Sequence, residues 1–247
     1  MSNIDKVWKK FKDIPMETVT KYYVYFHNNK IGYQRSLDEI INFHNEYGFS
    51  GNCFDLALWL KHEFDQLNID CYYIGHHFFS SDAHIAIVAL DNNQDMYLCD
   101  LGDQWIKPLP INRDFENKSF IGYFPNAIIS YQYINDLEIV INYKRPNGKV
   151  SKQTYDLSPI SNIEFMEAAN HSQNLIKSSP LIEKRKYRND EVLHWEFEKM
   201  VISIGSKNGV EKTEYQEFDR LSQEINKVTG FDIGIIKEVL INYESNI

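Results

Sequence analysis

The sequence predicts an α+β protein that runs as an N-terminal helical bundle, a central antiparallel β-barrel or sheet, and a C-terminal α/β lid. Three observations predict this order. Apolar residues recur at helical steps up to about Leu67, form short or alternating apolar runs from Cys71 to about Leu157, and mix both patterns beyond Ser158. We therefore expect three parts, at residues 1–70, 71–158 and 159–247.

Size and charge limit the possible functions. With 247 residues and 43% hydrophobic content, the chain can bury a sizeable core. The formal net charge of −9 is spread along the chain, which disfavours nucleic acid and favours small molecules or proteins as partners. No apolar run reaches the roughly 18 residues of a membrane span, and the N-terminus lacks the apolar core of a signal peptide. The 3 widely spaced cysteines fit reduced thiols, so we expect a cytoplasmic protein without a membrane anchor.

The first third is predicted to be helical. Residues 4–11, "IDKVWKKF", repeat apolar side chains at helical spacing. Residues 36–48 open with Ser36 and Glu39 in the spacing of a capping box and close on Gly48. The next helix reads "GNCFDLALWLKHEFDQLN", and it places Cys53 in its first turn.

The middle third is predicted to be strands joined by tight turns. The candidate strands are "CYYIGHHFF", "HIAIVAL", "MYLCDLG", "FIGYF", "AIISYQY", "LEIVINYK" and "VSKQTYDL". "DNNQD" separates the second from the third, and "RPNGK" separates the last two as a strong hairpin signal. Consecutive strands joined in this way form an antiparallel sheet or a small barrel.

The last third mixes helices with a hairpin. "SNIEFMEAANHSQN" is predicted to be a helix, and "WEFEKMVISIGSKNGVEKTEY" a hairpin that turns at Asn208 and Gly209. "EFDRLSQEINKVTGF" is predicted to be a closing helix with Gly230 at its C-terminus.

Three residues at the edges of these elements form a candidate catalytic site. Cys53 begins a helix, His84 opens the strand "HIAIVAL", and Asp100 ends the strand "MYLCD". Because the "DNNQD" turn pairs the two strands, His84 and Asp100 are expected at the same end of neighbouring strands, where Cys53 can join them.

This combination is suited to nucleophilic catalysis. A free thiol has a pKa of about 8.5, and a neighbouring imidazolium together with a helix N-terminus lowers it. In this interpretation Cys53 is the nucleophile, His84 is its base, and Asp100 holds the imidazole in the right tautomer. Backbone N–H groups of the first helical turn, including that of Cys53, are candidates for an oxyanion hole.

The other cysteines and histidines have simpler interpretations. Cys71 and Cys99 lie in or beside apolar strands and are interpreted as structural. His76 and His77, followed by Asp82 and His84, suggest a metal, but adjacent strand histidines point to opposite faces and no carboxylate or thiol at short ligand spacing completes a site. We therefore expect no metal. Asp55 and Asp95 are interpreted as helix-turn and loop carboxylates, not as catalytic residues.

These motifs resemble those of the arylamine N-acetyltransferases. The cysteine in "SGNCFDLALWLKHEF", the histidine opening "HIAIVAL" and the aspartate in "YLCDLG" resemble the family's three catalytic motifs. "NIEFMEAANHSQNLIKSSPL" and the end "TGFDI" are similar to its C-terminal segments, so the resemblance spans roughly residues 31–235. The chain departs from the family pattern before the cysteine, where Phe49 and Ser50 replace an arginine and a glycine, and after the aspartate, where it reads "DLGDQW".

The resemblance implies a papain-like cysteine core and a defined reaction. Cys53 would take an acetyl group from acetyl-CoA and pass it to an arylamine-like or hydrazine-like acceptor, with His84 as base and Asp100 as orienting acid. Coenzyme A and a small-molecule acceptor would then be the partners. Two alternatives remain open: a transglutaminase-like amidase or peptidase on the same triad, and a catalytically inactive family member that acts as a binding module.

Overall fold

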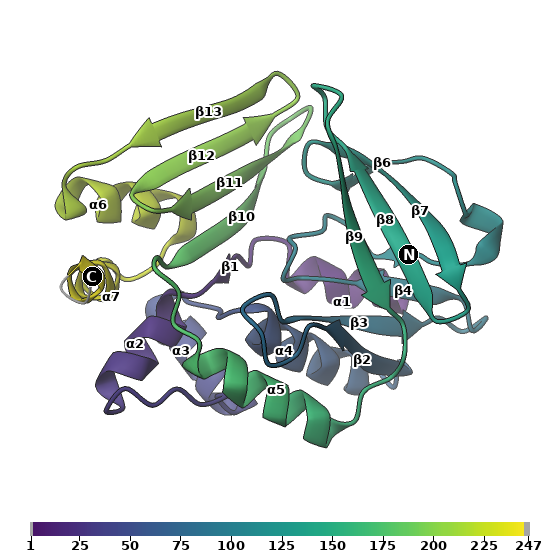
Figure 1. The fold of residues 1–247 in the computed structure, drawn as a ribbon, viewed down its shortest axis with the longest axis horizontal. Coiled ribbons are helices and arrows are strands. Elements are labelled where there is room, and N and C mark those ends of the chain that lie inside the picture. The colour runs from purple at the N-terminus through teal and green to yellow at the C-terminus, as the bar shows by residue number, and fades with distance from the viewer. Residues whose placement is uncertain (1, 245–247) are drawn as a thin grey trace.

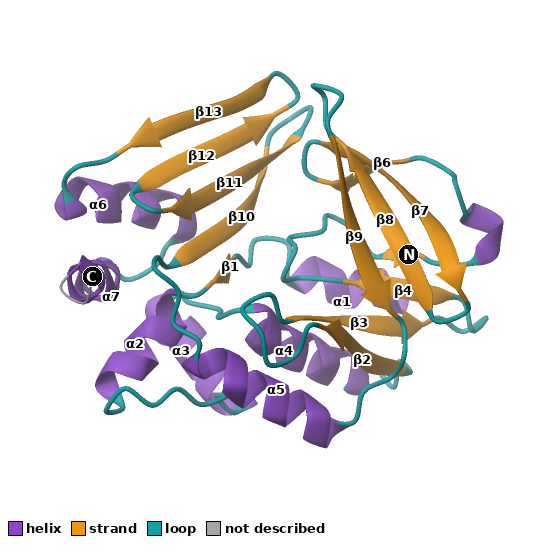
Figure 2. Cartoon of the chain, viewed as in Figure 1, coloured by secondary structure: helices purple, strands orange, loops and turns teal. Residues whose placement is uncertain are grey.

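The structure, a computed structural model, describes residues 2–244 and confirms the predicted α+β class. Within these residues the chain forms seven α-helices and three antiparallel sheets (Figures 1 and 2). The helices are α1 (Asn3–Lys10), α2 (Val19–His27), α3 (Leu37–Tyr47), α4 (Cys53–Asp65), α5 (Asn162–Asn174), α6 (Phe218–Thr229) and α7 (Ile233–Glu244). None of these described helices has the length and apolar character needed to cross a lipid bilayer.

Helix ends lie where the sequence predicts them. Ser36 caps α3 by accepting a hydrogen bond from the Glu39 backbone N–H, while the Glu39 carboxylate accepts one from the Ser36 N–H. The helix ends at Gly48, whose φ of 86° is a left-handed conformation that glycine adopts without strain. Gly230 ends α6 in the same way, with a φ of 79°.

The central third consists of two open sheets. One is a four-stranded sheet in the order β2 (Cys71–His76), β3 (His84–Leu90), β4 (Met96–Cys99), β5 (Leu109–Pro110). The other is a four-stranded sheet in the order β6 (Phe120–Phe124), β7 (Ala127–Asn135), β8 (Glu138–Lys144), β9 (Val150–Asp156). The "RPNGK" turn joins β8 to β9, as predicted.

The expectation of a closed barrel is wrong, and the alternative expectation of an antiparallel sheet is confirmed. No strand pairing among the described residues links the two central sheets. The chain leaves the first sheet through β5, which is two residues long and ends in Pro110. Because proline has no backbone N–H, this short edge strand is poorly suited to carry a hydrogen-bonded ladder onward. Apolar side chains join the sheets instead, in one core that also includes α1, α4 and α5.

The third sheet combines a strand from the N-terminal part of the chain with strands from the C-terminal part. It has five strands in the order β1 (Met16–Glu17), β10 (Leu181–Tyr187), β11 (Val192–Glu198), β12 (Val201–Ser206), β13 (Gly209–Glu214). The predicted hairpin is present, but it turns one residue earlier than expected, at Lys207 and Asn208, since Gly209 already pairs with Ser206. A second tight turn, at Lys199 and Met200, splits the predicted strand in two. Its residues have positive φ values of 51° and 60°. Lysine and methionine are not typical turn residues, so the sequence does not indicate this turn.

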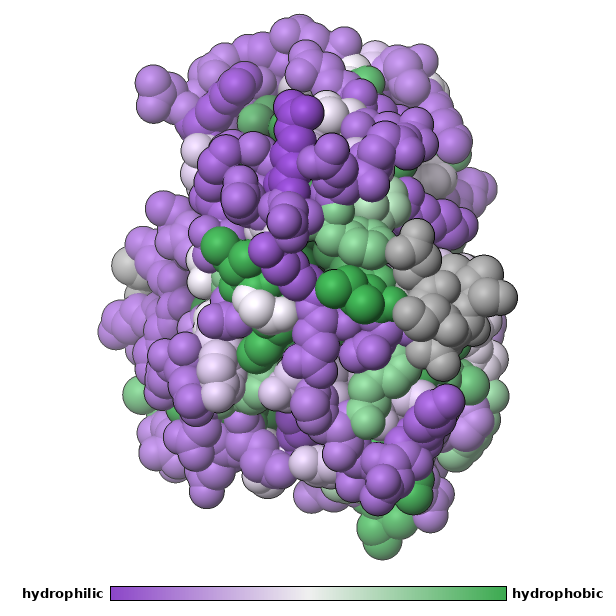
Figure 3. Space-filling model, turned by 90° about the vertical axis from the view of Figure 1, so that its left-hand side faces the viewer, coloured by the Kyte–Doolittle hydropathy of each residue, from purple (hydrophilic) through white to green (hydrophobic). Residues whose placement is uncertain are grey.

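Arg185 of β10 attaches the third sheet to the rest of the protein. Its guanidinium is buried and donates hydrogen bonds to the backbone carbonyls of Phe11 and Trp105, from segments far apart in the chain. Burial lowers its pKa to about 10, so it stays charged at neutral pH. On its other side, the sheet packs with α2, α6 and α7 into a second core. The outer face on the α7 side is mostly hydrophilic, with apolar groups gathered across its middle (Figure 3).

Candidate functional site

The structure brings Cys53, His84 and Asp100 together. Cys53 is the first residue of α4, His84 is the first residue of β3, and Asp100 follows the last residue of β4. β3 and β4 are antiparallel neighbours, and α4 packs against β3. All three side chains therefore meet at one end of this layer, as the sequence predicts.

The three side chains lie close together. His84 Nε2 lies 2.6 Å from Asp100 Oδ2, and the Cys53 side chain lines the same cavity as His84, close enough to raise the pKa of the imidazole. Gly102 packs against all three residues. A Cβ placed on Gly102 would lie 2.6 Å from Cys53 Cβ, 3.0 Å from His84 Cε1 and 3.3 Å from Asp100 Oδ1. A side chain at residue 102 would thus displace the groups that the strands and the helix assemble.

Hydrogen bonds hold Asp100 in its charged form. The Asp100 side chain is fully buried and accepts hydrogen bonds from the Tyr155 hydroxyl and the Asp103 backbone N–H, each at 2.9 Å. Burial raises the pKa of this carboxyl, but the neighbouring His84 charge and these hydrogen bonds outweigh burial and hold the pKa below its usual value.

The His84 imidazole is held in its charged form. Burial lowers its pKa, but the Asp100 carboxylate, followed by the neighbouring Cys53, raises the pKa well above the usual value. At neutral pH the site therefore contains a charged imidazolium at His84, next to Asp100 and Cys53.

The first turn of α4 offers one backbone donor to a bound group. The Asn52 side chain accepts hydrogen bonds from the backbone N–H groups of Phe54 and Asp55. Over residues 2–244, no acceptor is paired with the N–H of Cys53. Of the backbone N–H groups in the first turn that were expected as oxyanion-hole donors, the Cys53 N–H therefore remains the candidate, because those of Phe54 and Asp55 are already paired.

A buried polar network beneath this turn fixes its position. The Asp55 carboxylate forms an ion pair of 3.0 Å with Arg35 and accepts a hydrogen bond of 2.8 Å from Gln34. It also accepts from the Asn52 N–H, completing a capping box. Asp55 is therefore structural, as expected, whereas Gln34 and Arg35 were not predicted, because they come from the loop before α3 and only the fold brings them here.

Asp103 is a second carboxylate at this site that the sequence analysis missed. It follows Asp100 by one turn, and Tyr143 donates a hydrogen bond to it at 3.3 Å. Burial, and then the charge of Asp100, raise its pKa to about 6. The three-residue spacing in "DLGD" was the available signal, since such spacing within a turn places two carboxylates close together.

A cavity of about 220 Å³ lies at the Cys53 side chain. His84, Gly102, Asp103 and Lys21 are among the residues that line it. Burial lowers the pKa of Lys21 to about 8, although the charge of Cys53 opposes this shift. Lys21 comes from α2 and gave no local sequence signal.

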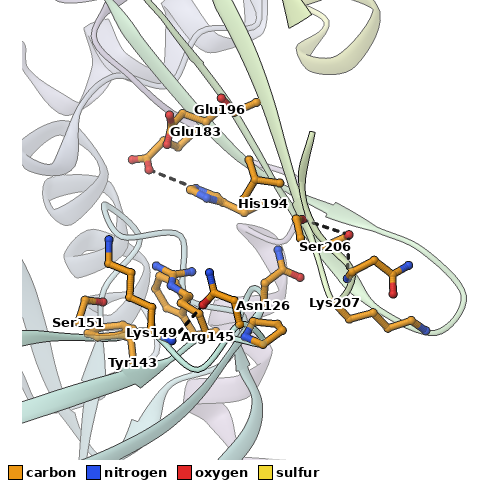
Figure 4. Close-up of a pocket in the computed structure, with 18 of the residues that line it drawn as sticks. Asn126, Tyr143, Arg145, Lys149, Ser151, Glu183, His194, Glu196, Ser206 and Lys207 are labelled. Carbon is orange, nitrogen blue, oxygen red and sulfur yellow. Dashed lines mark hydrogen bonds and ion pairs between the residues drawn. The ribbon is translucent and has the colours of Figure 1, made fainter. Parts of the chain in front are cut away.

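A larger pocket of about 820 Å³ adjoins this cavity, and Asp103 and Glu183 line both. It lies between the β8–β9 hairpin and strands β10–β13 of the third sheet (Figure 4). Its basic lining residues are Arg145, Lys149, Lys152, Lys207 and Lys212. The pocket therefore suits an anionic ligand that reaches toward Cys53.

Cys71, Cys99, His76 and His77 do not line the Cys53 cavity, although the His76 ring lies 5.7 Å from the His84 ring. Burial raises the pKa of the Cys71 thiol to about 11 and that of Cys99 well above its usual value, so both stay protonated at neutral pH. Burial, and then the nearby His84 charge, lower the pKa of His76 to about 4. His77 lies in the turn after β2 with a φ of 53°.

The fold and this site define an α+β protein with three antiparallel sheets and a Cys-His-Asp arrangement at a helix start. Solved structures of arylamine N-acetyltransferases have the same fold. No protein-family model matches the sequence, and no curated protein matches it.

Three solved structures illustrate the similarity. The Mycobacterium marinum arylamine N-acetyltransferase in complex with CoA superposes with a TM-score of 0.75 at 10% identity, over 95% of this chain and 90% of that one. The Nocardia farcinica enzyme gives a TM-score of 0.72 at 14% identity, over 96% and 85%. A Bacillus cereus arylamine N-acetyltransferase, described as having a Cys-His-Glu catalytic triad, gives 0.65 at 11% identity, over 92% and 89%. At these identities the comparison shows a shared fold.

Proposed function

We propose that this protein is a cysteine-dependent acetyltransferase that moves an acetyl group from acetyl-CoA to an arylamine-like or hydrazine-like acceptor. The observation that carries the proposal is the His84–Asp100 pair placed against Cys53 at the start of α4, inside a cavity. The shared fold of the arylamine N-acetyltransferases supports the same reaction class.

The geometry supports a two-step reaction. In the first step the Cys53 thiolate attacks the thioester carbonyl, and the Cys53 N–H can stabilise the resulting oxyanion. The C–S bond to coenzyme A then breaks, and the His84 imidazolium protonates the departing thiolate, which leaves acetyl-Cys53 and neutral His84. In the second step the acceptor nitrogen attacks acetyl-Cys53, His84 takes the proton from that nitrogen, and the Cys53 thiolate leaves.

The basic pocket supports coenzyme A as the carrier of the acetyl group. Coenzyme A presents phosphate groups at one end and its thiol at the other. The pocket presents lysine and arginine side chains, and it shares two lining residues, Asp103 and Glu183, with the Cys53 cavity. Phosphates in the basic pocket and a thioester at Cys53 satisfy both regions. The Mycobacterium marinum enzyme of the same fold was solved in complex with CoA.

Acetyl-CoA without any acceptor provides the test. The first step needs only Cys53 and His84, so a brief incubation should add about one acetyl group per chain, located by peptide mapping on the fragment that contains Cys53. An arylamine or a hydrazine should then remove it. Cys53→Ala should gain no mass, and Cys71→Ala is the matched control that should behave as wild type.

Two other outcomes would redirect the assignment. No mass gain with acetyl-CoA, together with an adduct from a peptide-type electrophile at Cys53, would favour a transglutaminase-like amidase or peptidase. Neither product would indicate a binding module that has lost the reaction. Either result would contradict the acetyltransferase proposal.

A further inference from the structure

A second cluster of chemically active side chains lies on β10 and β11, at the wall of the larger pocket. Glu183 of β10 and Glu196 of β11 are directly opposite each other in the ladder. His194 precedes Glu196 by two residues, so its side chain lies on the same face of the sheet. Figure 4 shows these three side chains grouped together, across the pocket from Arg145 and Lys149.

The distances within this cluster suit coordination of one ion. The candidate ligand atoms of Glu183, His194 and Glu196 all lie within 4.8 Å of one another. His194 Nε2 and Glu183 Oε1 are 3.2 Å apart. Metal–ligand bonds of about 2.0–2.2 Å place two ligand atoms of one ion about as far apart as His194 Nε2 and Glu183 Oε1 are here. A rotation of the Glu196 side chain would bring its carboxylate to the same ion as a third ligand.

The cluster is incompletely satisfied by the protein itself. Two carboxylates directly opposite on neighbouring strands repel each other. His194 pairs with Glu183. Among residues 2–244, no group donates a hydrogen bond to the Glu196 carboxylate, which is partly buried. The charges of His194 and Lys212 act on Glu196 only at a distance. A cation between the two carboxylates would reduce their repulsion and bind Glu196 directly.

From these observations we propose that Glu183, His194 and Glu196 bind a divalent transition-metal ion of the Zn²⁺ type. One imidazole nitrogen and two carboxylate oxygens are ligands that Zn²⁺ accepts, whereas Mg²⁺ and Ca²⁺ prefer oxygen alone. The side chains of His194 and Glu183 are 19% and 20% exposed and line the pocket. The ion therefore keeps open coordination positions that face the pocket, as in sites with three protein ligands.

This site is separate from the Cys53 site, but its charge can act on the Cys53 site. Glu183 also lines the cavity at Cys53, so an ion on Glu183 places positive charge at the junction of the two spaces. The proposal depends only on the β10–β11 cluster, and it holds whether or not acetyl-CoA is the donor.

Zn²⁺ titration by calorimetry tests the proposal, with Cys53→Ala as the parent protein because the Cys53 thiol is itself a zinc ligand. After removal of metals with a chelator, the parent should bind one Zn²⁺ per chain and gain thermal stability. With Co²⁺, it should show a visible ligand-field band and no sulfur-to-cobalt charge-transfer band, because the donors are nitrogen and oxygen.

Variants of the parent locate the ion. His194→Ala should weaken Zn²⁺ binding about tenfold or more, and Glu196→Gln, which keeps shape and removes charge, should also weaken it. His27→Ala is the matched control, since His27 contacts Glu238 and Tyr23, lines neither the larger pocket nor the Cys53 cavity, and should not affect Zn²⁺ binding. His76→Ala should likewise bind Zn²⁺ as the parent does. Absence of Zn²⁺ binding, or parent-like binding by the folded Glu196→Gln variant, would overturn the proposal.

Discussion

Gly102→Ala tests whether the close packing around Cys53 sets the rate of the reaction. The new Cβ would lie 2.6 Å from Cys53 Cβ, about 0.8 Å closer than the 3.4 Å of an ordinary van der Waals contact. Cys53 Cβ sits at the start of a helix and cannot yield as a flexible side-chain end would. Either α4 or the Leu101–Gln104 turn must therefore move by most of that distance.

A displacement near 1 Å at a reacting atom costs about 100-fold in rate, so kcat/KM should fall by about that factor. The free energy of unfolding should fall by about 1–3 kcal/mol, the usual effect of overpacking. Acetylation of Cys53 by acetyl-CoA, followed by intact mass over time, measures the rate, and thermal unfolding by circular dichroism measures the stability.

Gly234→Ala is the matched control. Gly234 is exposed in the first turn of α7, and its new Cβ would meet only Asp232 Oδ1, at 3.0 Å, the oxygen that accepts a hydrogen bond from the Ile235 N–H and would have to shift by a few tenths of an ångström. This variant should keep wild-type activity and stability, because alanine favours a helix. The expected loss is about 100-fold. If folded Gly102→Ala protein acetylates Cys53 at a rate within about threefold of wild type, the packing argument is wrong.

Three further predictions concern charges at the site. The folded-state pKa of Asp103 is about 6, above its ordinary value of 3.8. Protonated Asp103 therefore contributes to the free energy of unfolding in full below pH 3.8, and this contribution is lost as the pH rises through 6. Asp103→Asn should thus raise the free energy of unfolding by about 1–3 kcal/mol at pH 8 and by much less near pH 4, as denaturant titrations at the two pH values would show; equal effects at both would contradict this. Asp100→Asn should lower kcat by about 10²–10⁴, whereas Tyr155→Phe, which removes one hydrogen bond to Asp100, should cost only about tenfold. Similar losses in the two variants would argue against an orienting role for Asp100. Lys149→Ala should raise the KM for acetyl-CoA about threefold to tenfold, less at high salt, and leave kcat unchanged; an unaltered KM would remove the basic pocket from the donor site.

The candidate site was predictable where local rules determine it. Asn52 and Asp55 form a recognisable helix start, which locates Cys53. The "DNNQD" turn sets β3 against β4, which brings His84 to Asp100. Each of these inferences needs only neighbouring residues and one turn.

The remainder depends on long-range packing that no local pattern encodes. Lys21 reaches the cavity because α2 packs beside it, and Arg35 reaches Asp55 from another loop. A closed barrel and two open sheets share the same strand pattern, and the difference lies in a two-residue edge strand ending at Pro110. Met200 in a left-handed turn likewise has no signature in sequence, since tertiary contacts impose that conformation.

The buried Arg185 guanidinium has a mechanical consequence for entry into the pocket. Moving the third sheet outward would break the hydrogen bonds from the Arg185 guanidinium to the Phe11 and Trp105 carbonyls. An unpaired cation would then remain in an apolar interior, at a cost of several kcal/mol. The sheet is therefore a fixed wall instead of a moving flap. The rate at which an anionic ligand reaches the larger pocket should therefore depend on diffusion and ionic strength more than on any opening motion of this sheet.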